Sequence, residues 1–288
     1  MGHSRLATPS ATLAVLARHG LNTRKSLGQH FLVDDNVIGR ILELSAPSVS
    51  TAVLEVGPGI GTLTDALCSV AGHVIAIERD THLRPALNQM TALHDNLTVI
   101  YADAVTVPVS DLGTPLGAPV ALVANLPYGV AATVVLRMFA EMPSLRYAVV
   151  MVQAEVADRM TASPGSKSYG AYSVKLQLLA QPTGRFAVSR QCFLPPPRVD
   201  SAVVRLDRRQ GIYTAEEIAA ATATANAAFA QRRKTLRNSL KASLGAGPGD
   251  LDLALGDAGI DGGLRAEMLS VQEFVRLGAA LNGYGILP

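Results

Sequence analysis

The sequence contains no tryptophan, only 2 cysteines and 5% aromatic residues. Cys68 and Cys192 lack the spacing of a metal site and are too few for a disulfide framework, so the small disulfide-rich secreted class is excluded. No apolar run approaches the length that crosses a bilayer, and "ATLAVLARHG" lacks the flanks of a secretory leader. We therefore expect a cytoplasmic protein that makes no membrane contact.

Net charge is also low, at +2 over 288 residues, which argues against a uniformly basic nucleic-acid binder. The charge is unevenly distributed, however. Between residues 205 and 241 the chain carries eight cationic side chains against three acidic ones. The cationic residues are Arg205, Arg208, Arg209, Arg232, Arg233, Lys234, Arg237 and Lys241. A local excess of this kind can contact phosphates although the whole chain is nearly neutral.

Short apolar segments alternate with helical patterns through the first two-thirds of the chain. The segments predicted as strands are 52–57, 73–78, 97–103, 119–125 and 147–153, and the predicted helices include 62–70 and 133–142. Continuous apolar strands separated by helices indicate an α/β fold with a mostly parallel sheet covered on both faces. Segments 184–190 and 201–207 alternate more strictly and predict an antiparallel pair at the sheet edge.

Beyond Arg209 the strand signals stop. Thr214 with Glu217, and Ser270 with Glu273, each form a possible capping box ahead of a helical pattern. The sequence therefore predicts two domains: residues 1–210 as the larger catalytic domain and residues 211–288 as a small all-helical one.

Polar signals follow three successive strands. The glycine-rich "GPGIG" follows the first strand, and its G-x-G-x-G spacing differs from the dinucleotide G-x-G-x-x-G. Glu78 ends the second strand, where an acid can accept hydrogen bonds from a ribose, and Asp103 ends the third, where it can accept from a nucleobase amino group. Each signal alone is also compatible with a plain turn or a solvated cap. Together they predict a nucleoside-containing cofactor at the carboxyl ends of the strands.

The tetrapeptide "NLPY" (125–128) follows the fourth strand and is therefore directed into the same crevice. Pro127 restricts its own backbone and favours an extended Leu126, which would hold the Asn125 side-chain carbonyl and a backbone carbonyl as two fixed acceptors. Two acceptors suit an exocyclic amino group, and Tyr128 offers a face for stacking an extruded base. The alternative is a turn with a core tyrosine. The position of the tetrapeptide after the fourth strand favours an amino-group methylation site. Methyl transfer needs alignment of the reactants more than it needs acid–base groups.

Eight motifs resemble the ribosomal RNA adenine dimethyltransferases, most closely their KsgA-type small-subunit branch. They are "KSLGQHFL" (25–32), "LEVGPGIGTLT" (54–64), "IERD" (77–80), "DA" (103–104), "NLPY" (125–128), "SKSYGAYSV" (166–174), "FLPPPRVDSAVVRL" (193–206) and "QRRKTLRNSL" (231–240). The resemblance implies a Rossmann-like methyltransferase sheet with S-adenosylmethionine as methyl donor and no metal. It also implies, as substrate, two adjacent adenosines near the 3′ end of 16S rRNA in the immature small ribosomal subunit, and it implies a monomer.

The resemblance also assigns residues to roles. Implied cofactor-binding residues are Gln29, His30, Leu32, Gly57, Gly59, Gly61, Glu78, Asp103, Ala104 and Asn125. Implied catalytic residues are Asn125, Leu126, Pro127, Tyr128 and Phe193, with Phe193 stacking on the target base opposite Tyr128. His30 departs from the family, in which Asn is commoner at this position, and either side chain can form a hydrogen bond.

The cationic residues predicted to contact RNA are Lys25, Arg232, Arg233, Lys234 and Arg237. Arg233 and Arg237 are four positions apart, which on one helix would give a basic stripe. The alternative is an ordinary solvated face. Tyr169 and Tyr172 are helix-spaced and are interpreted as core residues.

Three other functions remain open from the sequence. An Erm-like enzyme would methylate an adenosine of large-subunit rRNA and confer macrolide resistance. A non-catalytic RNA-binding protein could retain the fold, although an intact "NLPY" argues against it. A nicotinamide oxidoreductase is disfavoured by the glycine spacing.

Overall fold

The computed structural model describes residues 2–21 and 29–287. The chain divides into two compact units, the first formed by Met1–Ala157 and Pro182–Arg208 and the second by Asp158–Gln181 and Arg209–Pro288. The sequence predicted a single boundary at residue 210. The structure differs because residues 158–181, placed by sequence in the catalytic domain, cluster with the C-terminal helices.

A seven-stranded sheet forms the centre of the first unit, in the order β4-β3-β2-β5-β6-β9-β7. The strands are β2 (Ala52–Val56), β3 (His73–Glu78), β4 (Leu97–Tyr101), β5 (Ala121–Asn125), β6 (Tyr147–Gln153), β7 (Ala180–Val188) and β9 (Ser201–Arg208). The first five pair in parallel, and β9 runs antiparallel to β6. The predicted mostly parallel α/β sheet with an antiparallel edge is confirmed.

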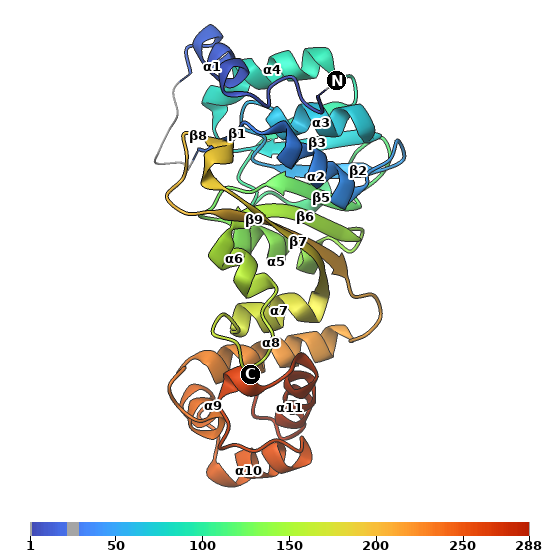
Figure 1. Cartoon of the computed structure of the whole chain (residues 1–288). Helices are drawn as coiled ribbons and strands as arrows, with labels where there is room; N and C mark the ends of the chain where they lie inside the picture. Colours follow the sequence, from blue (N-terminus) through green and yellow to red (C-terminus); the bar gives the residue numbers. More distant parts are fainter. Residues whose placement is uncertain (1, 22–28, 288) are drawn as a thin grey trace. The chain divides into compact units, whose positions relative to one another are not determined.

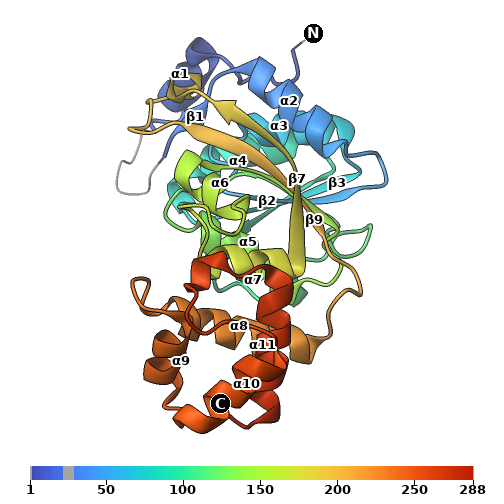
Figure 2. The same ribbon diagram turned by 60° about the horizontal axis from the view of Figure 1, so that its bottom comes forward.

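Helices cover both faces of this sheet. The helices that precede or alternate with its strands are α1 (Pro9–Arg18), α2 (Asp35–Ser45), α3 (Thr62–Val70), α4 (Arg84–Leu93), α5 (Ala131–Glu141) and α6 (Ala154–Met160). Figures 1 and 2 show α2 and α3 on one face and α5 on the other. Every residue of β2 and β3 is buried, which is why these strands are mostly apolar in sequence rather than alternating, with Glu55, His73 and Glu78 as the exceptions.

The strand register brings four strand ends to one edge of the sheet. Val56 of β2 pairs with Ile77 of β3, and Glu78 of β3 pairs with Tyr101 of β4. On the other side of β2, Leu54 pairs with Leu122, so β5 ends beside the turn that follows β2. Polar residues at these ends therefore lie at the carboxyl edge of the sheet, where ligands of open α/β folds bind.

A second, two-stranded sheet joins distant parts of the chain. β1 (Phe31–Leu32) pairs antiparallel with β8 (Phe193–Leu194). Two residues are too few to show a periodicity, so the sequence did not predict this pair. It brings the segment before α2 against the Pro-rich stretch before β9.

The second unit contains the helices α7 (Ala171–Leu179), α8 (Ala215–Phe229), α9 (Leu236–Leu244), α10 (Pro248–Asp257) and α11 (Val271–Gly283). Both predicted capping boxes are present, at Thr214–Glu217 before α8 and Ser270–Glu273 before α11. Tyr169 is 1% exposed and packs edge-on against Phe229, which stacks on Phe274. Tyr169 is therefore a core residue, as predicted.

Candidate active site

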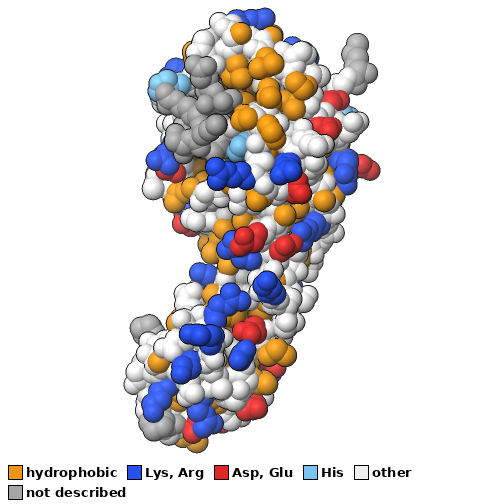
Figure 3. All heavy atoms as spheres, turned by 60° about the vertical axis from the view of Figure 1, so that its left-hand side comes forward, with side chains coloured by type: hydrophobic (Ala, Val, Ile, Leu, Met, Phe, Trp, Pro, Cys, Tyr) orange, Lys and Arg blue, Asp and Glu red, His pale blue; other side chains and the backbone are white. Residues whose placement is uncertain are grey.

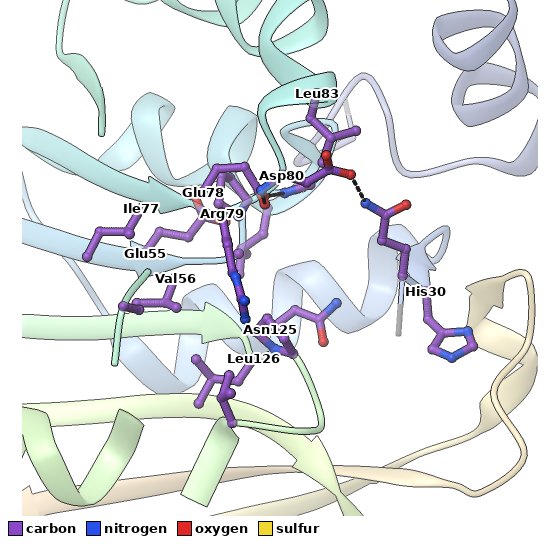
Figure 4. A pocket seen from close by; sticks show the side chains of 18 of the residues that line it. His30, Glu55, Val56, Ile77, Glu78, Arg79, Asp80, Leu83, Asn125 and Leu126 are labelled. Atoms are coloured by element: carbon purple, nitrogen blue, oxygen red, sulfur yellow. Dashed lines mark hydrogen bonds between the residues drawn. The ribbon is translucent and has the colours of Figure 1, made fainter. Parts of the chain in front are cut away.

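A cavity of about 470 Å³ lies at the carboxyl edge of the sheet, within the first unit. Its walls come from the residues before α2 and from the segments that follow β2, β3, β4 and β5. Figure 4 shows side chains from these separate strand ends extending into one space. The volume falls within the range of pockets that bind cofactors.

The glycine-rich turn after β2 forms part of the cavity lining. Gly57 has φ +74° and Gly59 φ +62°, a region that L side chains rarely adopt. A Cβ atom on Gly57 would lie 3.0 Å from the ring of Pro127, and one on Gly59 would lie 3.2 Å from the ring of Phe31. Both glycines line the cavity, whereas Gly61 forms the N-cap of α3 and does not.

Glu78 holds its carboxylate in a fixed position at the end of β3. One oxygen accepts a hydrogen bond from the Gly59 N–H at 3.2 Å, and the other accepts from the Asp80 N–H at 2.7 Å. Burial raises the pKa of Glu78, and these amide hydrogen bonds oppose the rise. Because each carboxylate oxygen can accept more than one hydrogen bond, two ribose hydroxyls can be bound here as well.

Asp103 and Ala104 line the cavity beyond β4. The Asp103 Oδ1 atom accepts from the Val105 N–H at 2.9 Å, and Oδ2 lies 3.4 Å from Nη1 of Arg79. Asp103 keeps a third of its side chain exposed, at 33%. It therefore offers the cavity an acceptor that solvent also reaches.

Thr62 and Glu55 are among the lining residues that were not identified from the sequence. The Thr62 hydroxyl, at the start of α3, is buried and has no hydrogen-bond partner among the residues described. Glu55 is 1% exposed and accepts a hydrogen bond from the Thr64 hydroxyl at 2.7 Å. Burial raises the pKa of Glu55 to about 8, so this carboxyl is largely protonated at neutral pH. The signal for Thr62 was its place just after "GPGIG", at a helix N-terminus.

The tetrapeptide after β5 projects from the strand that ends at the centre of this edge. Leu126 is 1% exposed and its N–H donates to the Met151 carbonyl at 3.0 Å, which anchors the segment to β6. The Pro127 carbonyl accepts from the Val130 N–H at 3.1 Å, which closes the turn after β5. Figure 4 shows the Asn125 amide extending into the cavity.

Tyr128 and His30 form one aromatic wall. Their ring centroids are 5.7 Å apart at an interplanar angle of 28°, and the Tyr128 hydroxyl lies 2.7 Å from Ser201 Oγ. His30 Nδ1 lies 2.8 Å from the Pro195 carbonyl oxygen, which can only accept, so Nδ1 carries the proton. His30 lines the cavity, and its ring lies against the tyrosine predicted to stack on the target base; its predicted contact with the cofactor stays a prediction.

Of the remaining predicted site residues, some line the cavity and one does not. Gln29 and Leu32 line the cavity, and the Gln29 side chain donates to Asp80 Oδ2 at 2.8 Å. Phe193 is not among the lining residues. It is 3% exposed and packs in the core beside Leu32 through the β1–β8 pairing, so the structure does not bring it together with Tyr128.

The predicted RNA-binding residues lie in the second unit, except Lys25, which falls outside the described residues. Arg232, Arg233 and Lys234 are exposed in the turn between α8 and α9. Arg232 donates to the Lys167 carbonyl at 3.3 Å, and Arg237 pairs with Asp252 at 3.2 Å. The expected helical stripe is wrong, because helix α8 ends at Phe229 and Arg237 belongs to a separate helix, α9.

Within the described parts of the chain, no cluster of three or more His, Cys, Asp or Glu residues could hold a metal ion. Among the same residues no helix has the length and apolar character needed to cross a membrane.

Comparisons with known proteins agree on one family. The family model described as "Ribosomal RNA adenine dimethylase" matches residues 20–282. A curated protein of Rhodococcus opacus, named ribosomal RNA small subunit methyltransferase A, is 44% identical over 286 residues, covering 96% of this chain and 95% of its own. The protein of the same name from Bacillus mycoides is 38% identical over 283 residues, covering 96% and 97%.

Solved structures show the same fold. A dimethyladenosine transferase from Plasmodium falciparum superposes with a TM-score of 0.74 at 24% identity, covering 90% of this chain and 99% of its own. The 23S rRNA methyltransferase ErmE superposes with a TM-score of 0.66 at 28% identity, covering 88% and 99%.

Proposed function

The chain belongs to the ribosomal RNA adenine dimethylase family, and from this premise we propose that it dimethylates the 6-amino groups of two adjacent adenosines near the 3′ end of 16S rRNA. The family makes it an S-adenosylmethionine-dependent rRNA adenine dimethyltransferase. The observation that carries the residue-level proposal is the convergence of Glu78, Asp103 and Asn125 on one cavity.

The cavity fits the methyl donor. Glu78 would bind the ribose and Asp103 the adenine amino group, while the bare backbone at Gly57 and Gly59 leaves room for the methionine part. The unpartnered Thr62 hydroxyl, at the N-terminus of α3, supplies a further polar contact for that part. Bound there, the cofactor supplies a methyl group already activated by its positive sulfur.

The residues around Asn125 position the acceptor nitrogen. The Asn125 side-chain carbonyl and the Leu126 carbonyl would accept the two hydrogens of the target amino group, which directs its lone pair at the methyl carbon. The Tyr128 ring would stack under the extruded base. Anchoring of Leu126 to Met151 fixes this geometry before substrate binds. The acidic proton of the alkylated nitrogen then leaves to water, so no histidine base is required.

The small subunit is favoured over the large subunit as substrate. The curated relatives at 38–44% identity are named as small-subunit methyltransferases, and they cover nearly the whole chain. ErmE, named as a 23S rRNA enzyme, is less similar at 28%. We place the reaction in the cytoplasm, on an assembling small subunit, with the protein acting as a monomer.

The second unit would bind the rRNA backbone. Figure 3 shows Lys and Arg side chains gathered on one face of this unit. The exposed turn with Arg232, Arg233 and Lys234 adds three cationic groups, which suit phosphate contacts.

The test is to map 6-methyl groups on small subunits from a strain that lacks this activity, before and after incubation with the protein and S-adenosylmethionine. Both adjacent adenosines should become dimethylated. Asn125→Ala should lower the rate by about 100-fold or more while S-adenosylhomocysteine still binds, because the lost contact acts mainly on the reacting nitrogen.

The matched control is Asn88→Ala, an exposed position on α4 outside the cavity. It should leave the rate unchanged. Methylation of 23S rRNA instead of 16S rRNA, or full activity in Asn125→Ala, would refute the proposal.

A further inference from the structure

Arg79 occupies a position in the cavity that neither the cofactor nor the target amine explains. It follows Glu78 directly at the end of β3, lines the cavity and keeps 70% of its side chain exposed. Figure 4 shows the side chain running from the strand end into the cavity. A cation that lines the site and remains exposed can contact solvent, cofactor or a polyanion.

Its partner is the carboxylate that the proposed function assigns to the adenine of the cofactor. Nη1 of Arg79 lies 3.4 Å from Asp103 Oδ2, while Oδ1 already accepts the Val105 N–H at 2.9 Å. Oδ2 is the oxygen without a backbone amide, and an adenine amino group that binds there competes with Arg79. The two neighbouring acids already have other hydrogen-bond donors. Both Glu78 oxygens accept backbone amides, and Asp80 Oδ2 accepts from Gln29.

The Arg79–Asp103 pair is easily exchanged. Its separation of 3.4 Å exceeds the 2.7–3.2 Å range of ordinary N–H···O hydrogen bonds. Ion pairs as exposed as this one contribute little, since water solvates the guanidinium as soon as it leaves. An adenine amino group, brought to Asp103 by a cofactor whose ribose is bound at Glu78, can therefore displace Arg79.

We infer that cofactor binding converts Arg79 from an internal ion-pair partner into a binding residue for an rRNA phosphate beside the target adenosine. This inference rests on the proposed function. Before the cofactor binds, Arg79 is neutralised by Asp103; afterwards its charge is available at the cavity to the polyanionic substrate. Cofactor and RNA then bind with positive coupling, and by linkage each raises the affinity of the other by the same factor.

The experiment measures binding of unmethylated small subunits with and without saturating S-adenosylhomocysteine, across a salt series. For the unaltered protein the ligand should raise subunit affinity about two- to fivefold, the scale of an exposed ion pair. It should also steepen the salt dependence by about one phosphate contact. In Arg79→Gln both effects should disappear, and Arg79→Lys, which keeps the charge, should restore most of the change in affinity.

Arg84→Gln is the matched control. Arg84 is exposed, lies over the ring of Tyr101 at 4.0 Å and does not line the cavity. It removes the same charge five residues away and should keep the ligand effect.

Asp103→Asn supplies an independent readout because it releases Arg79 without any ligand. Subunit affinity without ligand should rise toward the liganded value of the unaltered protein. The same substitution should have a smaller effect when combined with Arg79→Gln.

An equal ligand effect in Arg79→Gln and the unaltered protein would overturn the inference. So would an unaltered protein that binds S-adenosylhomocysteine and methylates 16S rRNA but gains no subunit affinity, and in that case the proposed function would stand. Failure to methylate or to bind the ligand at all would instead contradict the proposed function.

Discussion

At the end of β2, Glu55 is an acid whose ionisation depends strongly on the fold. Its ordinary pKa of 4.5 rises to about 8 because the carboxyl is buried, with the Thr64 hydroxyl opposing and the nearby Glu78 adding to the rise. Between these two values the folded protein holds a proton that the unfolded chain has lost. The free energy of unfolding contributed by Glu55 therefore falls as pH rises through this window, and it is flat below and above it.

Glu55→Gln should remove this dependence. Gln is neutral at every pH and its carbonyl can still accept from Thr64. The variant should match the original near pH 5 and become progressively more stable relative to it toward pH 8, by up to about 1.4 kcal/mol per pH unit. Urea unfolding followed by circular dichroism, which suits a chain without tryptophan, measures this difference.

Glu43→Gln, at an exposed position on α2, is the control and should change stability by less than about 0.5 kcal/mol. A stability difference for Glu55→Gln that is independent of pH would show that Glu55 is ionised in the folded protein.

Single residues were predictable where a strand end determines their place. Glu78, Asp103 and Asn125 line one cavity because parallel strands end at a common edge, which sequence alone indicates. The functional roles assigned to them stay predictions. The surroundings of His30 and Phe193 were not predictable, because they depend on the β1–β8 pairing and on a hydrogen bond between residues 165 positions apart.

Among the elements, the turn after β2 and the segment after β5 restrict each other. Gly57 has φ +74°, and a Cβ atom added to it would lie 3.0 Å from the Pro127 ring. The two motifs look independent in sequence, but in the fold there is no room between them for a side chain at residue 57.

Gly57→Ala should therefore lower affinity for S-adenosylhomocysteine by about tenfold or more, because the added methyl group displaces Pro127 as well as straining the backbone. Isothermal titration calorimetry measures the affinity. Gly117→Ala is the matched control, since Gly117 also has a positive φ, +97°, and a methyl group added there would meet no atom of a non-neighbouring residue within 4 Å. It should lose stability but not affinity, and equal affinity loss in both variants would contradict the contact argument.

Element boundaries followed the hydrophobic pattern closely. The predicted strands 73–78 and 147–153 and the helix 62–70 coincide with β3, β6 and α3. The pattern failed where an element is very short, as in β1 and β8, or where no turn residues mark its start. The edge strand β7 begins at Ala180 rather than at residue 184, directly after α7, where no turn residues mark the change from helix to strand.

At the scale of the whole molecule, the proposed cofactor cavity and the proposed RNA-binding turn lie in different units. The cavity belongs entirely to the first unit, and the exposed cationic turn at residues 232–234 to the second. Substitutions in the turn should therefore change RNA binding without changing cofactor binding.

Lys234→Glu should weaken binding to small subunits severalfold to tenfold and flatten its salt dependence, with affinity for S-adenosylhomocysteine unchanged. Lys241→Glu makes the same charge reversal at an exposed position on α9, outside the turn, and should have a smaller effect. Filter binding across a salt series compares the two. Equal losses would mean that net charge, rather than the turn, governs binding.

Sequence placed the change from sheet to helices near residue 210 but assigned residues 158–181 to the wrong side. Composition does not indicate which unit α7 belongs to, because α7 is as apolar as the helices that cover the sheet. Only its packing reveals its membership: Tyr169, Val174 and Leu178 lie in the core formed with α8 and α11.

This two-segment construction of the second unit has an evolutionary consequence. Recombination between two related genes that exchanged only the part encoding residues 209–288 would combine α8–α11 of one ancestor with α7 of the other. The core of the second unit would then be built from two different sequences. The second unit is therefore expected to be inherited together with the first, because its first segment is encoded between the two segments of the first unit.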